Sequence, residues 1–214
     1  MVKVAPSVLS ANFAELKNEI DSITECKADW IHYDVMDGHF VPNISFGYSI
    51  LKDLSKVTDL YLDVHLMISD PKKYVDEFIK ANASLITFHV EAMNSIEETN
   101  ELIDYIHSQG CDAGISIKPN TPVSDIEPFL DGLDLVLVMS VEPGKGGQAF
   151  IEDSIRKINQ LYDVREKQNY NYVIEVDGGI NDTTIKKCYK ADICVVGSFI
   201  TKQNYEEALR KLRD

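Results

Sequence analysis

The stretch Trp30-Ile31-His32-Tyr33-Asp34-Val35 shows the pattern on which the fold depends, a short apolar run of strand length with two polar side chains on one face. Comparable runs, rich in Val, Ile and Leu, recur from one end of the chain to the other. They lie at residues 4–9, 60–67, 85–90, 113–117, 133–139, 172–176 and 193–196. Together with the first stretch they give eight predicted strands.

Apolar side chains at helical spacing fill most of the intervals between these runs. Strands that alternate with helices pair in parallel through right-handed crossovers, and eight such units close a (β/α)₈ barrel. We therefore expect an α/β protein that forms a single TIM barrel. The predicted helical stretches lie within residues 13–23, 74–79, 102–106, 151–161 and 205–212.

A doubly wound open sheet is the competing α/β architecture. Its nucleotide-binding form carries a Gly-x-Gly-x-x-Gly turn after the first strand. The corresponding stretch here, Ser7-Val8-Leu9-Ser10-Ala11-Asn12, contains no glycine. No linker, low-complexity tract or change in composition divides the chain, so we expect one catalytic domain over residues 1–214.

The chain is strongly acidic, because 21 Lys and Arg residues stand against 35 Asp and Glu residues, for a net charge of −14. Such a surface repels nucleic acids and anionic lipids, so we expect neither as a partner. No apolar run approaches the roughly 20 residues that span a bilayer, and no signal peptide is evident. The four cysteines lack Cys-x-x-Cys spacing, which is typical of reduced, packed thiols in a cytoplasmic protein.

Polar residues stand at the end of every predicted strand. In a TIM barrel, the active site lies at these C-terminal ends and in the loops that follow them. The sequence therefore predicts a polar site at the barrel mouth. Its candidate residues are Ser7, His32, Asp34, His65, His89, Glu91, Lys118, Ser140, Asp177 and Ser198.

Two neighbouring strands offer metal-ligating side chains. His32 and Asp34 are two residues apart and share a face of one strand, and Asp63 and His65 do the same on the next. If these faces line the barrel, His32, Asp34 and His65 give a divalent metal three ligands, with Asp177 as a fourth. Such a set suits zinc, iron, manganese or cobalt. The spacing leaves open that the histidines are core residues hydrogen-bonded to carboxylates.

Asp34 and Asp177 belong to strands two and seven, so a small substrate at the mouth would have one carboxylate near each face. Such a pair can remove a proton from carbon on one face and return one on the other, which inverts the stereochemistry. The two protonation states must differ, and a bound metal would stabilise the enediolate oxygen. Asp37 is a third acid nearby, and we interpret it as a turn former because it precedes Gly38.

Glycines follow strands six, seven and eight, where barrels of this class commonly hold a phosphate. Without a side chain, each of them lets backbone N–H groups approach an anion closely. These local dipoles also allow an acidic protein to bind an anion. The residues that we expect to form this phosphate site are Gly144, Gly146, Gly147, Gly178, Gly179, Gly197 and Ser198.

Five segments together closely resemble the ribulose-phosphate 3-epimerase family, and the resemblance runs from about residue 4 to the final strand. The block Met36-Asp37-Gly38-His39-Phe40-Val41-Pro42-Asn43 is highly specific. The resemblance implies a small TIM barrel of the ribulose-phosphate-binding type. It also implies the interconversion of D-ribulose 5-phosphate and D-xylulose 5-phosphate in the pentose phosphate pathway. The five segments are residues 5–13, 32–43, 63–68, 143–148 and 176–180.

The resemblance also implies residue roles. One divalent metal ion would be held by His32, Asp34, His65 and Asp177, with Asp34 and Asp177 as the acid/base pair. The family commonly assembles as dimers or hexamers, so a homo-oligomer is expected. Contacts with the sugar would come from Ser7, Met36, His65, Met67 and Met139, and the glycine loops would hold the phosphate end of the ketose phosphate.

Three alternative functions fit the residues less well than ribulose-phosphate epimerisation. An epimerase acting on D-allulose 6-phosphate would share the mechanism, but segments 41–47 and 175–180 follow the ribulose-phosphate branch. A phosphate-barrel lyase would need an Asp-x-Lys strand end, whereas strand two ends His32-Tyr33-Asp34. A sugar-phosphate sensor would tolerate the loss of a base or ligand, and none is missing. One departure from the family is Lys145, which stands where the glycine loop usually carries Phe and could alter lid closure or contact the substrate.

Overall fold

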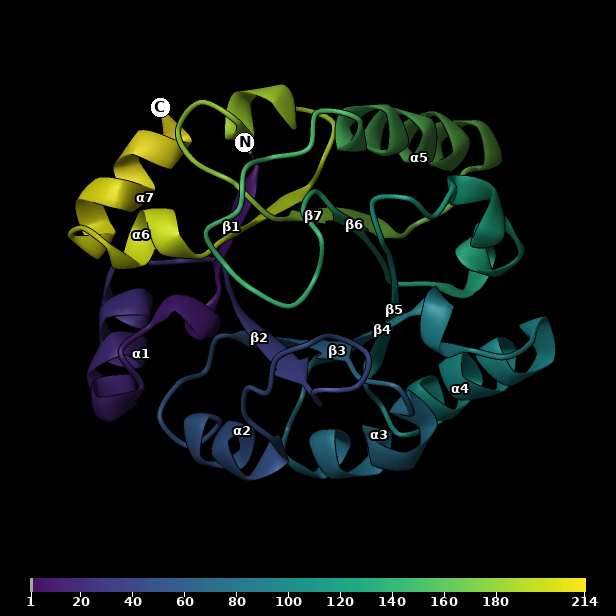
Figure 1. Ribbon diagram of the computed structural model, residues 1–214, viewed down its shortest axis with the longest axis horizontal. Helices are drawn as coiled ribbons and strands as arrows, with labels where there is room; N and C mark the ends of the chain where they lie inside the picture. Colours follow the sequence, from purple (N-terminus) through teal and green to yellow (C-terminus); the bar gives the residue numbers. More distant parts are fainter. Residues whose placement is uncertain (1) are drawn as a thin grey trace.

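The computed structural model describes residues 2–214, and its centre is an eight-stranded parallel sheet. The strand order is β1-β8-β7-β6-β5-β4-β3-β2, and a single parallel bridge between Ser7 and His32 joins the two outer strands. The sheet thus curls into a nearly closed barrel, which confirms the predicted fold (Figure 1). The strands are β1 (Lys3–Pro6), β2 (Trp30–Met36), β3 (Tyr61–Met67), β4 (Leu85–His89), β5 (Asp112–Ile117), β6 (Leu135–Met139), β7 (Val173–Asp177) and β8 (Ile193–Val196).

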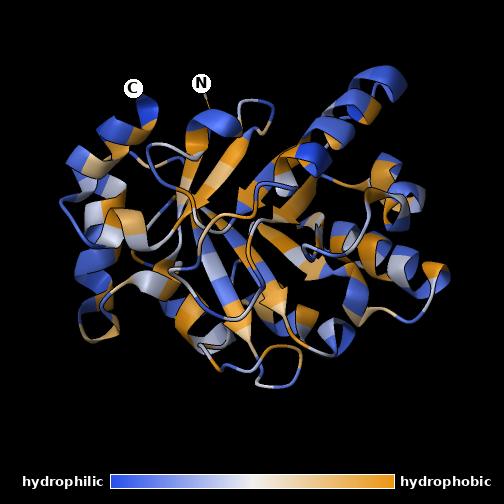
Figure 2. Ribbon diagram, turned by 45° about the horizontal axis from the view of Figure 1, so that its top comes forward, coloured by the Kyte–Doolittle hydropathy of each residue, from blue (hydrophilic) through white to orange (hydrophobic). Residues whose placement is uncertain are grey.

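Helices form a ring outside the strands (Figure 1). Their apolar faces turn toward the strands and their hydrophilic faces turn outward, which is the hydropathy pattern in Figure 2. The N-terminal and C-terminal segments lie on the same side of the molecule (Figure 1). The α-helices are α1 (Leu16–Glu25), α2 (Tyr48–Leu54), α3 (Pro71–Lys80), α4 (Ile96–Ser108), α5 (Ser154–Gln168), α6 (Ser198–Thr201) and α7 (Tyr205–Arg213).

The element boundaries correct the sequence prediction in several places. The first strand ends at Pro6 rather than at residue 9, because the Ser7 hydroxyl accepts a hydrogen bond from the Leu9 N–H and begins a short 3₁₀ helix. The stretch 13–23 likewise begins with a 3₁₀ turn before α1. The periodicity did not indicate α2 or α6. Only 3₁₀ helices connect β5 to β6 and β7 to β8.

Side chains alternate strictly between the barrel interior and the surrounding helices. On β3, Leu62, Val64 and Leu66 belong to the large apolar core under the helices. Asp63 and His65 therefore point into the barrel, where both are fully buried. The same alternation on β2 turns His32 and Asp34 inward, so strand parity delivers polar side chains to the barrel centre.

Two further expectations can be compared with the structure. None of the helices within residues 2–214 has both the length and the apolar character needed to cross a membrane. All four cysteines are free thiols, as expected; Cys111, Cys188 and Cys194 are buried, whereas Cys26 is only half-buried at the end of α1.

Candidate active site and metal centre

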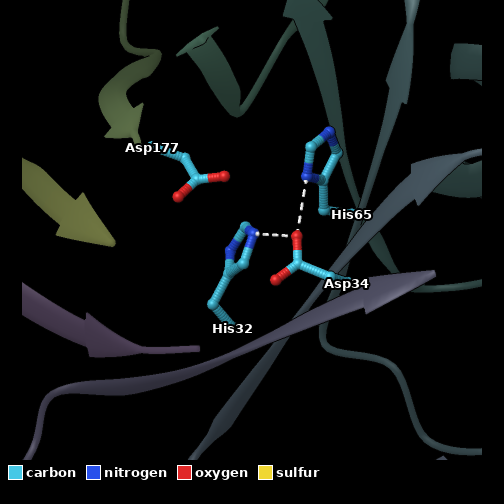
Figure 3. A group of neighbouring side chains, drawn as sticks. All are labelled: His32, Asp34, His65 and Asp177. Carbon is cyan, nitrogen blue, oxygen red and sulfur yellow. Dashed lines mark hydrogen bonds and ion pairs between the residues drawn. The ribbon is translucent and has the colours of Figure 1, made fainter. Parts of the chain in front are cut away.

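Four side chains from three strands converge at the mouth of the barrel: His32, Asp34, His65 and Asp177 (Figure 3). One candidate ligand atom from each lies within 4.8 Å of those of the other three. The two histidines and Asp34 are buried, whereas Asp177 is partly exposed at the end of β7. The structure thus brings together the whole set that the sequence proposed, and this buried group could hold a metal ion.

Asp34 is the centre of this group. Its Oδ1 lies 3.2 Å from His32 Nε2 and 3.2 Å from His65 Nδ1 (Figure 3). Its Oδ2 accepts a hydrogen bond of 2.6 Å from the Ser7 hydroxyl. Strand register explains the arrangement, because Asp34 pairs with His65 across β2 and β3, and Ser7 forms the closing bridge beside His32.

His32 is fixed from behind by a second carboxylate. Asp63, its register partner on β3, receives a very short hydrogen bond from the His32 Nδ1 nitrogen. His32 Nε2 is buried, faces Asp34 and makes no hydrogen bond within the described residues. Neighbouring Glu175 on β7 is also fully buried; neither of its carboxyl oxygens has a hydrogen-bond partner within residues 2–214, and Oε1 lies 3.9 Å from His32 Nδ1. Burial opposes a charge on His32, but Asp63 and Asp34 together raise its pKa well above the ordinary value.

The two candidate acids have pKa values shifted in opposite directions. Burial raises the pKa of Asp177 to about 7, and the negative charge of Asp34 adds to this effect. Burial acts in the same sense on Asp34, but the positive charge of His32 and the contacts with both histidines hold the pKa of Asp34 well below its usual range. The pair can therefore carry one proton between them near neutral pH.

A cavity opens above this cluster. Asp34 and Asp177 lie on its wall, whereas His32 and His65 lie beneath it and do not line it. The sequence proposed contacts with the sugar at Ser7, Met36, His65, Met67 and Met139, and all of these except His65 line the cavity. The thioether side chains give one wall an apolar, adaptable surface.

The glycine loops also line the cavity. Among residues 2–214, the N–H groups of Gly146, Gly147 and Gly179 donate no hydrogen bond, so these donors are available to a ligand. Gly179 has a φ of +64°, and a Cβ on it would lie 2.5 Å from the Phe150 nitrogen. The glycines and the serine predicted for the phosphate end, Gly144, Gly146, Gly147, Gly178, Gly179, Gly197 and Ser198, all line the cavity.

The loop after β6 is held over the barrel centre (Figure 1). Asn43 Nδ2 donates to the Gly144 carbonyl at 2.9 Å, and Gln148 Nε2 donates to the carbonyls of Glu142 and Lys145 at 2.7 and 2.8 Å. The Lys145 side chain is exposed at the rim of the cavity. This geometry is compatible with contact between the Lys145 ammonium and an anion.

Asp37 does not join the cluster. Its Oδ1 accepts hydrogen bonds of 2.8 Å from the backbone N–H groups of His39 and Phe40, and its Oδ2 accepts a hydrogen bond of 2.8 Å from the N–H of Ser69. The Ser69 hydroxyl also donates to Oδ2, and this bond and the three backbone bonds outweigh burial and lower the pKa of Asp37 to about 2. Its interpretation as a turn former is confirmed.

Several polar residues near the cluster received no role in the site from the sequence. Asp63 and Glu175 share the inward face with His32, and parity could have pointed to them. His89 and Glu91 were noted only as polar strand ends, although His89 Nε2 lies 2.9 Å from His65 Nε2. That contact depends on how β3 and β4 are staggered, which the sequence does not show.

Comparisons with known proteins address the family directly. Residues 3–201 match the model of the ribulose-phosphate 3 epimerase family. The chain is 46% identical to a ribulose-phosphate 3-epimerase of Bacillus subtilis, covering 100% of this chain and 99% of the relative. It is 44% identical to a chloroplastic ribulose-5-phosphate-3-epimerase of Arabidopsis thaliana, covering 98% of this chain and 75% of the relative.

Solved structures add support for the fold. A 3-keto-L-gulonate-6-phosphate decarboxylase from Vibrio cholerae superposes with a TM-score of 0.74 at 15% identity, over 99% of this chain and 95% of that protein. At this identity the likeness concerns the barrel alone. The sequence matches, by contrast, extend over nearly the whole chain at more than 40% identity, and they show that the protein belongs to the ribulose-phosphate 3-epimerase family.

Proposed function

We propose that this protein is a metal-dependent ribulose-phosphate 3-epimerase, which interconverts D-ribulose 5-phosphate and D-xylulose 5-phosphate in the pentose phosphate pathway. Family membership supports the reaction, and the names of the relatives favour this substrate over D-allulose 6-phosphate. The observation that carries the proposal is the pairing of Asp34 and Asp177 on different strands at one cavity, with oxygens within 4.8 Å of each other.

The donor set fits a divalent metal ion. Two imidazoles and two carboxylates match the preferences of zinc, iron, manganese and cobalt. The buried His32 Nε2 lies 3.2 Å from Asp34 Oδ1 and makes no hydrogen bond within the described residues, so it is available as a ligand atom. A metal held by His32, Asp34, His65 and Asp177 would act as a Lewis acid on the oxygens of the enediolate.

The two carboxylates perform the proton transfers. Asp34 and Asp177 come from β2 and β7, so they address a substrate in the cavity from two sides. One carboxylate accepts the C3 proton, and the other, protonated, delivers a proton to C3 from the opposite face. The roles exchange in the reverse direction. The opposite pKa shifts of the two acids support this division.

The remaining cavity residues bind the substrate. Ser7, Met36, Met67 and Met139 line the part of the cavity that adjoins the acids, and they would contact the sugar. His65 lies beneath the cavity, so its part is to hold the metal. The unbonded amides of Gly146, Gly147 and Gly179 would receive the phosphate, because backbone N–H groups bind anions without a full positive charge.

Assembly and location are further parts of the proposal. Exposed apolar side chains at Ile44 and Tyr48, 76% and 42% accessible, would suit contact between copies in a dimer or hexamer. The four free thiols support a reducing compartment such as the cytoplasm. Sedimentation velocity and cell fractionation test these two points.

Turnover of two ketose phosphates on one metal-loaded sample tests the assigned reaction. We expect kcat/KM for D-ribulose 5-phosphate to exceed that for D-allulose 6-phosphate. A higher value for the six-carbon substrate would assign the chain to the sister activity. No turnover of either, in protein that binds metal, would contradict the proposed reaction altogether.

A further inference from the structure

A chain of hydrogen bonds leads away from the back of His65. The Nδ1 atom of His65 faces Asp34, and its Nε2 atom lies 2.9 Å from Nε2 of His89 on the neighbouring strand β4. The Nδ1 atom of His89 lies 2.9 Å from Oε2 of Glu91. Both imidazoles are fully buried, so neither can exchange these partners for water. The chain therefore links the candidate metal centre to the loops outside the barrel.

The outer end of this chain is firmly anchored. Glu91 Oε1 accepts a 2.7 Å hydrogen bond from the Lys118 N–H and a very short one from the Thr121 hydroxyl. The ammonium group of Lys157, on α5, donates to the carbonyls of Lys118, Pro119 and Thr121 at 2.8, 2.7 and 2.6 Å. Lys157 thus fixes the loop that fixes Glu91.

An aromatic cover limits the movement of His89. The Phe40 ring packs on the imidazole with 4.7 Å between centroids, and Lys118 Nζ lies 3.8 Å from the Phe40 ring centroid on a cation–π contact. The His89 ring is therefore held in one plane between the Phe40 ring and the barrel interior. Its two nitrogens are therefore placed to form hydrogen bonds with His65 and Glu91.

The hydrogen-bond donors and acceptors in this chain determine where the protons lie, starting from Glu91 and ending at His65. A carboxylate only accepts, so Glu91 requires a proton on His89 Nδ1. In a neutral imidazole, the form that full burial favours, His89 Nε2 is then an acceptor. His65 must donate from its Nε2, so a neutral His65 keeps a lone pair on Nδ1. That lone pair faces Asp34, an arrangement that is repulsive unless a cation lies between the two.

We propose that His89 and Glu91 are positioning residues that set the tautomer and orientation of His65 for metal binding. Glu91 fixes the proton on His89, His89 accepts the proton of His65 Nε2, and the opposite nitrogen of His65 is presented to the metal. Hydrogen-bond partners behind a histidine ligand are known to raise its basicity and to fix its ring. This inference rests on the proposed metal centre and extends it to a second strand and a loop.

The proton positions can be read directly in the wild-type protein. Two-bond ¹H–¹⁵N correlation spectra of the zinc-loaded, ¹⁵N-labelled protein distinguish protonated from bare imidazole nitrogens. We expect His89 to carry its proton on Nδ1 and to have a bare Nε2. A His89 ring protonated only on Nε2, or on both nitrogens, would overturn the proposal.

Variants test the contribution to metal affinity, measured by competition for Zn²⁺ with a chromophoric chelator. His89→Phe removes the acceptor, and we expect zinc affinity to fall by about 10–100-fold. His89→Gln keeps an acceptor near the Nε2 position and should restore affinity to within about threefold of wild type. Glu91→Gln removes the charge and should weaken binding by about tenfold. Glu127→Gln is the matched control, because Glu127 is exposed and takes no part in this chain of hydrogen bonds.

The outcomes separate the two proposals. A wild-type protein that binds no zinc would contradict the metal centre itself. Wild-type affinity in both His89→Phe and Glu91→Gln, with zinc bound normally by the parent, would leave the metal centre intact and overturn the role of His89 and Glu91. The ¹H–¹⁵N spectra of the parent protein still decide the question if His89→Phe does not fold.

Discussion

The carboxyl groups of Asp34 and Asp177 present oxygens within 4.8 Å of each other, although they stand on β2 and β7. Their pKa values are displaced in opposite senses: burial and the charge of Asp34 raise the pKa of Asp177, whereas the two histidines beside Asp34 outweigh burial and lower its pKa. Asymmetry between two acids is what an epimerisation needs, since one must accept a proton while the other donates one. In the proposed reaction, the two carboxylates at the barrel mouth would act on opposite faces of the substrate.

The proposed metal centre implies that activity depends on a bound ion. The purified protein should contain about one divalent metal ion per chain, because the four donors form one group. Prolonged dialysis against a chelator should abolish activity, and added Zn²⁺, Fe²⁺, Mn²⁺ or Co²⁺ should restore it to different extents. His65→Ala should weaken metal binding and lower kcat together. Full activity in a preparation shown by elemental analysis to lack metal would contradict the assignment.

The position of Lys145 at the rim of the cavity predicts that its substitution weakens substrate binding. If its ammonium contacts the phosphate from the rim of the cavity, Lys145→Ala should raise KM with little effect on kcat, and the increase should shrink as salt is added. Lys186→Ala, at an exposed lysine that does not line the cavity, is the control. Lys145→Phe restores the residue usual in the family, and a higher kcat in that variant would favour closure of the loop by packing. Changes below about twofold in both variants, under about 0.5 kcal/mol, would make Lys145 a bystander.

Gly178 predicts a steric requirement at the glycine loops. Its φ is +121°, and a Cβ there would lie 2.5 Å from Val141 Cγ2. Gly178→Ala should therefore lower the free energy of unfolding by about 1–3 kcal/mol and reduce activity by displacing the neighbouring amides. Gly132→Ala is the matched control, because a Cβ at Gly132 meets nothing within 4 Å. Equal urea midpoints for the two variants would show that the loop accommodates a side chain.

The fold could be predicted because strands and helices alternate and because parity separates inward from outward residues. On β2 and β3, parity alone placed His32, Asp34 and His65 on one interior face. Parity does not give register, however, so the hydrogen bond between His32 and Asp63 and the approach of His89 to His65 could not be predicted. These contacts link different strands, and only their stagger brings the atoms together.

Two connections carry elements for which the sequence showed no helical period, and the reasons are local. The segment from Val123 to Gly132 begins beside Pro122 and contains Pro128, and these prolines favour short 3₁₀ turns over an α-helix. The short helix α2 buries only Leu51 and Leu54, too few apolar positions to show a helical period. The glycine loops were located correctly in sequence, but their placement around one cavity follows from barrel closure.

Asp37 predicts a pH-dependent contribution to stability. Its folded-state pKa of about 2 lies below the ordinary value of about 3.9, so the ionised carboxylate stabilises the fold above pH 4. This contribution is lost as the pH falls through about 2. Asp37→Asn should lower the urea midpoint at pH 7, and the difference from wild type should narrow below pH 4. Asp59→Asn, at an exposed aspartate, should show no such trend; a constant difference at all pH values would contradict the explanation.

Epimerisation and C3 proton exchange by the Asp177→Asn variant in deuterated solvent test the central claim most directly. The amide of the variant can neither accept nor donate the C3 proton. For metal-loaded Asp34→Asn and Asp177→Asn, we expect epimerisation to fall by at least about 10²–10⁴-fold. We also expect Asp177→Asn to exchange the C3 proton of one epimer for deuterium through its intact Asp34 without producing the other epimer, as followed by NMR. Ordinary turnover with inversion in either variant would contradict the two-carboxylate mechanism.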